Sequence, residues 1–417
     1  MAQPLSKTTE DAPYAMARHL LTLLAFIALF IGCTQEEQND AAVTTPAGEP
    51  VVTFLAAAND PTRGTAMSGT FDTNAQFRVY ATVQEREGDA PKTGTTPEEF
   101  INGDVVSYQR IPAYVQSGYI WVWKTDADYW WPQDNIMVTF YAIHPATAPQ
   151  MTGFPDTKTF AYTSGEGGQL IDGDTDLMYA YVQTHRDDKT FTSVTENVGD
   201  NSTVALRFHH LLSQVAFYGK LSNLFSSFGW TVEVGGITLH NVNAAATIQF
   251  ATSSFTITAA ETPVLQDYTL AMNDSRQPVT TTTVAKDGNN KNIPLTSPTD
   301  VKMLVPQTLT AWVPASQDGG TTIASAPTGS YLEIAMRIKD SNNQYQMGTA
   351  DNYQTVYVPF GTIWQSGKRH NYTLTFGAGY DANGNPNIET ITIEAAIMPW
   401  QTDEVAPATV KREKTTN

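Results

Sequence analysis

The sequence is poor in cysteine and in charged residues. Cys33 is the only cysteine among 417 residues, and charged side chains make up 16% of the chain, below the usual quarter. A single cysteine cannot form a disulfide within the chain, so packing and backbone hydrogen bonds must stabilise the fold. Thr, Ser, Asn and Gln fill many polar positions beside 28 Gly and 23 Pro, a composition that suits strands and turns.

Basic residues are scarce as well. Lys and Arg number 24 against 42 Asp and Glu, which gives a formal net charge of −18. A chain of this charge repels phosphate backbones, and no basic stripe is visible along it. The composition therefore argues against nucleic acid as a partner.

Long apolar runs are missing except near the N-terminus. Leu20–Ile31 form a 12-residue run that is too short to span a bilayer comfortably and is typical of a signal-peptide core. Gly32 and Cys33 follow and resemble a lipobox, although Phe30 stands where an aliphatic residue is usual. We expect a lipoprotein signal peptide over residues 1–32 and lipidation of Cys33. An ordinary secretory signal or an N-terminal membrane anchor is the alternative.

A polar segment rich in Gln, Thr, Ala and Pro follows the cysteine. It indicates a flexible tether over residues 33–49. Its acidic start, Thr34–Asp40, resembles surface-export signals of some Gram-negative anaerobes, and a plain solvated tether explains it equally well.

Amphipathic helical patterns of convincing length are absent, whereas alternation with a period of two recurs. It is visible in Phe77–Val83, Ile136–Ala142, Val204–Phe208, Leu332–Lys339, Tyr372–Phe376 and Ile391–Glu394. Many short strands separated by Gly- and Asn-rich turns are typical of β-sandwiches and barrels. We predict an all-β fold with two domains, over residues 50–202 and 203–417. The boundary is expected near the end of the polar segment Asp187–Ser202.

No pattern predicts a catalytic or metal site. His209 and His210 are adjacent, so on a strand they would point to opposite faces. Asp172–Asp176 and Asp381–Asn385 lack the sixth-position glycine and terminal glutamate of an EF-hand loop and indicate turns. A nucleophile elbow and a glycine-rich phosphate loop are also missing. We therefore expect no enzymatic activity, no cofactor and no metal.

Tryptophans gather in one part of the sequence, at Trp121, Trp123, Trp130 and Trp131. Trp121 and Trp123 would share one face of a strand, which favours core packing and still leaves room for one exposed ring. A sugar-binding platform would require one of these four rings, or Trp312, to face solvent.

Several local patterns occur in an order that resembles the fimbrillin family, also called Mfa-like. They are Phe77–Ala81, Tyr129–Pro132, Val138–Ala142, Asp176–Ala180, Val204–Val215, Leu304–Gln307, Gly367–Tyr372 and a closing strand that ends at Trp400. The resemblance implies two tandem transthyretin-like β-sandwich domains in a lipoprotein precursor. It also implies a surface-exposed place at the cell outer membrane, with the chain as stalk, anchor or tip of a fimbrium. The implied partners are other fimbrial subunits, joined by strand exchange, and a host protein or glycan for a tip.

The start of the first domain fits that implication. Pro50–Ala58 form an apolar strand, and the polar stretch Asn59–Thr65 follows with a single arginine, Arg63. The family is trimmed by an arginine-directed protease, which implies a cut between Arg63 and Gly64. Loss of the strand would open a groove for a partner's strand, and about four buried apolar side chains there would contribute roughly 6–12 kcal/mol.

Two alternatives remain open at this point. Arg63 can be merely an exposed loop residue. The chain as a whole can instead be a monomeric surface glycan-binding lipoprotein of a nutrient-uptake system.

Overall fold

The structure is a computed structural model that describes eleven stretches of the chain. They are residues 51–58, 69–112, 118–132, 135–188, 203–251, 253–273, 277–279, 293–313, 328–377, 391–399 and 412–414. All of these stretches belong to one compact unit of the chain, residues 50–417. Within the described stretches the only helical elements are η1 (Arg186–Asp188) and α2 (Asn223–Ser227). The prediction of an all-β fold is confirmed.

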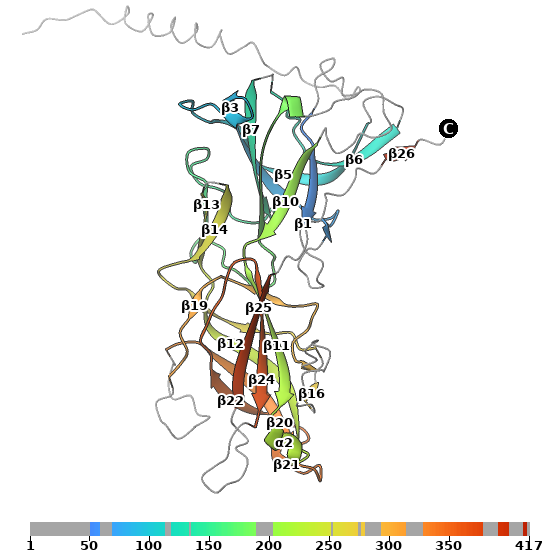
Figure 1. The fold of residues 1–417 in the computed structure, drawn as a ribbon, viewed down its shortest axis with the longest axis vertical. Helices are drawn as coiled ribbons and strands as arrows, with labels where there is room; N and C mark the ends of the chain where they lie inside the picture. The colour runs from blue at the N-terminus through green and yellow to red at the C-terminus, as the bar shows by residue number, and fades with distance from the viewer. Residues whose placement is uncertain are drawn as a thin grey trace, which may run out of the picture. The chain divides into compact units, whose positions relative to one another are not determined.

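The first sheet is formed mainly by strands from the first half of the chain, together with one strand near the C-terminus (Figure 1). Its order is β2 (Gly69–Thr70), β1 (Phe54–Ala58), β10 (Val204–His210), β9 (Met178–His185), β7 (Ile136–His144), β3 (Phe77–Glu87), β5 (Glu98–Pro112), β6 (Gly118–Thr125) and β26 (Arg412–Lys414), with β4 (Ala90–Pro91) beside β3. β1 also pairs with β6, where Phe54 lies opposite Trp123. Through this second pairing the sheet closes on itself.

The closed sheet surrounds an aromatic core. Alternate residues of each strand point inward, as the period of a strand requires, and Phe54, Phe77, Phe140 and Phe208 are completely buried there. Strand β7 is buried along both faces after its first residue. Its outward-facing Tyr141 belongs to a second apolar cluster.

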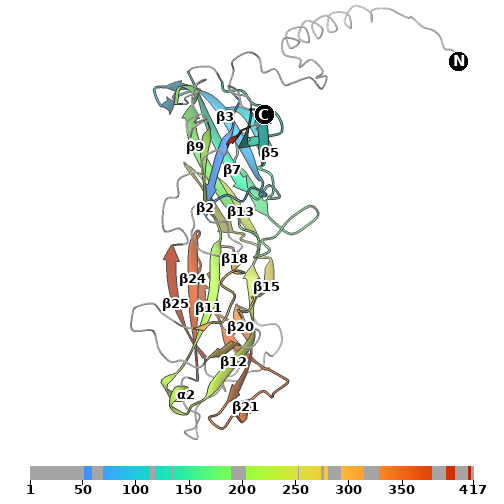
Figure 2. The same cartoon turned by 90° about the vertical axis from the view of Figure 1, so that its right-hand side faces the viewer.

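A second group of strands forms a sandwich around a separate core. One layer is β17 (Ile293–Pro294), β11 (Ser213–Leu221), β24 (Lys368–Phe376) and β25 (Ile391–Pro399), with β18 (Lys302–Leu304) beside β11. Figure 2 shows β11, β24 and β25 side by side. The other layer is β15 (Leu265–Thr269), β12 (Thr231–Asn243), β20 (Tyr331–Lys339) and β21 (Tyr345–Met347), with β16 (Gln277–Val279) and β22 (Gln354–Pro359) at its sides.

The core of this sandwich receives apolar residues from both layers. Phe217 of β11 and Tyr372 of β24 stack at 5.3 Å between ring centroids. Leu239 of β12 and Ile334 of β20 belong to the same buried cluster from the opposite layer. A short pair, β19 (Thr308–Leu309) and β23 (Thr362–Ile363), adds Leu309 to this cluster.

A small third sheet joins segments from both groups. Its order is β14 (Ser254–Ala259), β13 (Ala246–Ala251) and β8 (Thr159–Tyr162). β8 precedes β10 in the chain and β13 follows β12, so the two predicted domains share backbone pairing here.

The division into two domains remains a proposal. The pairing of the strands moves the boundary that we propose between them. The sequence suggested that the second domain begins at residue 203, which would include β10. However, β10 pairs with β1 and β9, and its Val204, Leu206 and Phe208 are buried in the first core. We therefore propose the boundary after His210, before β11.

Candidate strand-exchange site around β1

β1 and the residues before it form an apolar segment that is buried without interruption from Val51 to Ala57. Val52, Phe54 and Ala56 belong to the first core. The residues that alternate with them are buried as well, namely Val51, Leu55 and Ala57. The apolar run in the sequence is thus explained by a strand that is covered on both faces.

Phe54 is the anchor of this segment. Its side chain is 0% exposed and meets Phe77 and Phe140 edge to face, at centroid distances of 6.3 and 5.7 Å. These are the favourable geometries for aromatic pairs. Removal of β1 would therefore leave a cavity beside the aromatic rings of Phe77 and Phe140.

The backbone of the segment is paired along its length. Phe54 to Ala58 run parallel to Val204–Phe208 of β10, and Val204 N–H donates to the Thr53 carbonyl at 2.8 Å. Earlier in the chain, Val52 N–H donates to the Tyr129 carbonyl at 2.7 Å. A strand that replaced β1 would have to satisfy the same donors and acceptors.

Tyr129 itself is held in place from the other side. Its hydroxyl donates to the Asp104 carboxylate at 2.6 Å. Burial raises the pKa of Tyr129 to about 12, and the hydrogen bond to Asp104 adds to this effect. The hydroxyl is therefore protonated at physiological pH and fixes the segment that flanks β1.

β1 is the strand that closes the sheet. The strands β10, β9, β7, β3, β5 and β6 pair in that order without it, and β1 connects the two ends of this series. Its departure would open the sheet while every pairing among those six strands persists. This is the property that strand exchange requires.

A strand near the C-terminus, β26, pairs with β6 close to the point where β6 meets β1. Arg412, Glu413 and Lys414 of β26 pair antiparallel with Ile120, Tyr119 and Gly118 of β6. β1 pairs with β6 only at Trp123, so this part of β6 is open to another strand. No local pattern in the sequence signals this contact or the parallel pairing of β1 with β10.

The predicted site residues themselves fall outside the described stretches. This applies to the lipidation residue Cys33 and to the proposed cleavage residues Arg63 and Gly64. In the chain, Arg63 lies between the end of β1 at Ala58 and the start of β2 at Gly69. A cut there would separate β1 from all later strands.

The histidines and the first aspartate loop have structural roles. The Nδ1 atom of His210 lies 2.9 Å from a carboxylate oxygen of buried Asp176, whereas His209 packs on the Tyr179 ring. Asp172 accepts backbone hydrogen bonds from Asp174 and Thr175 at 2.9 and 2.8 Å. Burial acts to raise the pKa of Asp172, but hydrogen bonds from Thr175 and Asp174 outweigh it and lower the pKa. The loop is a turn, while Asp381–Asn385 lie outside the described residues.

The tryptophans divide between the cores and their margins. Trp123, Trp131 and Trp312 are buried, and Trp121 is half-buried against Tyr108, with stacked rings 5.4 Å apart. Trp130 is also half-buried. Core packing, which the sequence favoured for the cluster of four tryptophans, accounts for Trp123 and Trp131, which belong to the first core.

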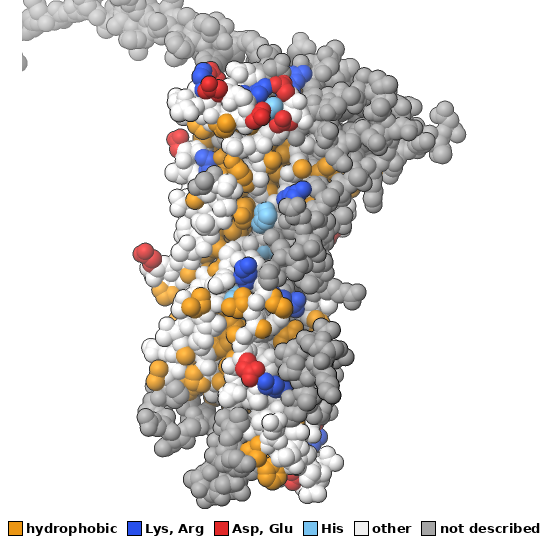
Figure 3. All heavy atoms as spheres, viewed as in Figure 1, with side chains coloured by type: hydrophobic (Ala, Val, Ile, Leu, Met, Phe, Trp, Pro, Cys, Tyr) orange, Lys and Arg blue, Asp and Glu red, His pale blue; other side chains and the backbone are white. Residues whose placement is uncertain are grey.

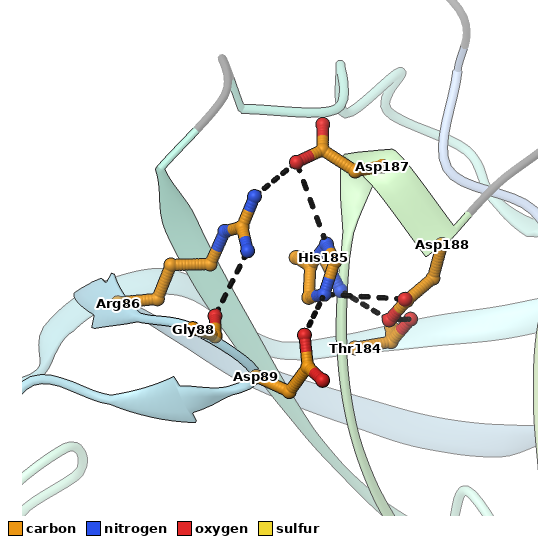
Figure 4. A network of polar contacts seen from close by, with 7 residues as sticks. All are labelled: Arg86, Gly88, Asp89, Thr184, His185, Asp187 and Asp188. Atoms are coloured by element: carbon orange, nitrogen blue, oxygen red, sulfur yellow. Dashed lines mark hydrogen bonds and ion pairs between the residues drawn. The ribbon is translucent and has the colours of Figure 1, made fainter.

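A polar network lies where β3 and β9 end (Figure 4). The His185 Nε2 atom faces oxygens of Asp188 and Asp89 at 3.1 and 3.5 Å. Arg86 donates to the Gly88 carbonyl at 2.8 Å and pairs with Asp187. In Figure 3 the charged side chains of this face are densest at that same end. The network ties the β3–β4 turn to the end of β9.

Among the described residues, no set of three or more His, Cys, Asp or Glu side chains is arranged to hold a metal ion. The same stretches contain no helix with the length and apolar character needed to cross a membrane.

Comparison with known proteins identifies the family. Residues 62–400 match the family model described as fimbrillin-like, which covers most of the chain. The protein belongs to the fimbrillin-like family, a structural and adhesive family rather than an enzymatic one. No curated protein matches the chain.

Solved structures that match this chain include two from Bacteroides species. A fimbrial protein from Bacteroides vulgatus is 16% identical, with 84% of this chain and 99% of that chain covered and a TM-score of 0.41. A candidate cell adhesion protein from Bacteroides uniformis is 12% identical, with coverages of 86% and 100% and a TM-score of 0.36. At these low scores we draw nothing further from the two structures.

Proposed function

We propose that this chain is a structural or adhesive subunit of cell-surface fimbriae, exported as a lipoprotein and assembled by β-strand exchange at the β1 site. Family membership supports the fimbrial role. The observation that carries the mechanism is the position of β1, which is the one strand among the described stretches that connects β10 to β6. The chain would be stalk, anchor or tip of the fimbrium and would sit at the surface of the outer membrane.

The energetics of β1 suit an exchange between equivalent strands. The segment Val51–Ala58, which contains β1, has four large buried side chains, Val51, Val52, Phe54 and Leu55, and burial of each contributes about 1.5–3 kcal/mol. An empty groove would therefore be strongly unfavourable. A strand of similar pattern from another subunit would recover the same burial and satisfy the open edge of β10.

Cleavage after Arg63 would make the exchange possible. While β1 is covalently attached, its effective concentration at the groove is very high, and a partner's strand cannot compete. After cleavage β1 can be lost for good, and the lipid on Cys33 leaves with it. A subunit that escapes cleavage would keep both β1 and its lipid and would act as the membrane anchor.

The test of this mechanism is the substitution Arg63→Ala. We expect it to leave lipidated monomers, because the groove stays filled. Envelope fractions warmed mildly in detergent would then lack the ladder of oligomers that the unmodified chain gives on an electrophoresis gel.

Arg63→Lys serves as the matched control. A strictly arginine-directed protease leaves this variant uncut and monomeric as well, whereas a protease that accepts both basic residues restores the ladder. An undiminished ladder from Arg63→Ala would contradict cleavage at this position.

A further inference from the structure

A surface groove is lined by residues of the second group of strands and of β14 in the small third sheet. It has a volume of about 490 Å³ and lies between the β14–β15 connection and β19, beside the end of β12. Figure 1 shows β14 and β19 along the same side of the chain. This volume falls within the range of roughly 300–1,000 Å³ that is usual for small-ligand sites.

The inner wall of the groove is fixed by amide side chains. The Asn243 side-chain oxygen accepts from the N–H groups of Ala245 and Val264 at 3.0 and 2.9 Å, and its nitrogen donates to the Ala260 carbonyl at 3.0 Å. The Gln307 side chain donates to the Asn243 carbonyl at 2.9 Å. Because these amides are already bonded, the wall keeps its shape without a ligand.

Exposed hydroxyls stand around this fixed wall. Thr258, Thr308 and Thr310 line the groove and are exposed, and each hydroxyl can both donate and accept a hydrogen bond. Glu261 is the only charged residue among the described residues that line it. These groups suit a ligand that is rich in hydroxyls and has no charge of its own.

Apolar surface lies next to the hydroxyls. Leu265 lines the groove with 54% of its surface exposed, and Pro263 and Pro306 line it as well. A sugar ring presents hydroxyls at its edge and C–H groups on its faces, so this combination matches both parts of the ring.

Other ligand classes fit less well. No lysine or arginine lines the groove among the described residues, and the chain carries a net charge of −18, so phosphates and acidic sugars would be repelled. A single carboxylate, Glu261, is too little for a polyvalent cation. We propose that this groove binds a neutral carbohydrate.

The proposal extends the fimbrial role by giving the subunit a ligand, and in that sense it rests on the proposed function. Binding by the isolated chain does not require assembly, however. Loss of assembly in Arg63→Ala with intact sugar binding, or the reverse, would separate the two.

The experiment presents the full-length protein, in a polyoxyethylene detergent that contains no sugar, to an immobilised panel of neutral oligosaccharides and their sialylated counterparts. We expect binding to at least one neutral glycan, competition by the same free glycan, and loss of binding to its sialylated form. Binding to none of the neutral glycans, or equal binding to sialylated ones, would overturn the proposal. Binding only to an extended peptide, offered in a parallel array, would do the same.

Variants locate the site on the protein. The double substitution Thr258→Val and Thr308→Val removes two hydroxyls with little change in shape, and we expect it to weaken binding about tenfold or more. Thr262→Val is the matched control, since Thr262 is exposed and adjacent to Glu261 but does not line the groove. Equal affinities for the double variant and the unmodified protein would assign the binding to another surface and overturn the proposal.

Discussion

At the scale of single residues, Phe54 is the side chain on which the β1 site depends most. It is buried, it contacts two other phenylalanines edge to face, and it lies opposite Trp123 at the point where the sheet closes. Its loss would therefore affect both the first core and the closing contact.

We expect Phe54→Ala to lower the free energy of unfolding by about 3–5 kcal/mol, because the surrounding sheet can only partly fill the cavity. Denaturation in urea, followed by tryptophan fluorescence, measures this change. Phe228→Ala is the matched control, since Phe228 is 47% exposed and should cost far less. Equal losses for the two variants would show that Phe54 is not an anchor of the first core.

The sequence predicted strands correctly where apolar and polar residues alternate clearly. It did not predict which faces of those strands are exposed to solvent. The alternating series around Phe77 and Ile136 became β3 and β7. The sequence could not tell that the second face of β7 is also covered, because Tyr141 and Ile143 pack against a separate cluster. Period-two patterns identify a strand, but they do not reveal what lies over its outer face.

At the scale of elements, the informative pair is β1 and β10. They run parallel although about 150 residues separate them along the chain, and the connection between parallel strands carries no turn signature. For this reason the sequence indicated an apolar first strand but not its neighbour. The unseen pairing of β10 with β1 also accounts for the difference between the boundary that the sequence suggested, before β10, and the boundary that we propose, after it.

The parallel pairing predicts that β1 can be replaced by a peptide. After cleavage following Arg63 and removal of the excised piece in denaturant, a synthetic peptide with the sequence of Val51–Ala58 should restore a cooperative unfolding transition. A peptide with Phe54→Asp should fail, because it would bring an unpaired charge into the aromatic core. Isothermal calorimetry distinguishes them, and equal binding of both peptides would contradict a specific groove.

At the scale of the whole molecule, the sequence predicted the all-β class and the family, while the site depends on contacts between distant segments. The family patterns are short and local, so they can be identified in a single sequence. Closure of the sheet by β1 and pairing of β26 with β6 join segments that lie far apart along the chain, such as Phe54 with Trp123 and Arg412 with Ile120. No single sequence encodes such contacts in a form that can be identified by inspection.

Attachment to the membrane also belongs to this scale. We expect Cys33→Ala to release the protein from membranes, because the proposed lipid is its anchor before cleavage. Metabolic labelling with a fatty-acid probe, followed by fractionation, checks this. Unchanged attachment of the variant, with no label on the unmodified chain, would contradict lipidation.

The central claim is that β1 is excised and exchanged when the subunit enters a fibre. Mass spectrometry of the N-terminus of the chain in purified fibres tests this claim most directly. The proposed mechanism predicts a chain that begins at Gly64 and has lost β1 together with its lipid. A chain in assembled fibres that still begins at lipidated Cys33 would contradict it.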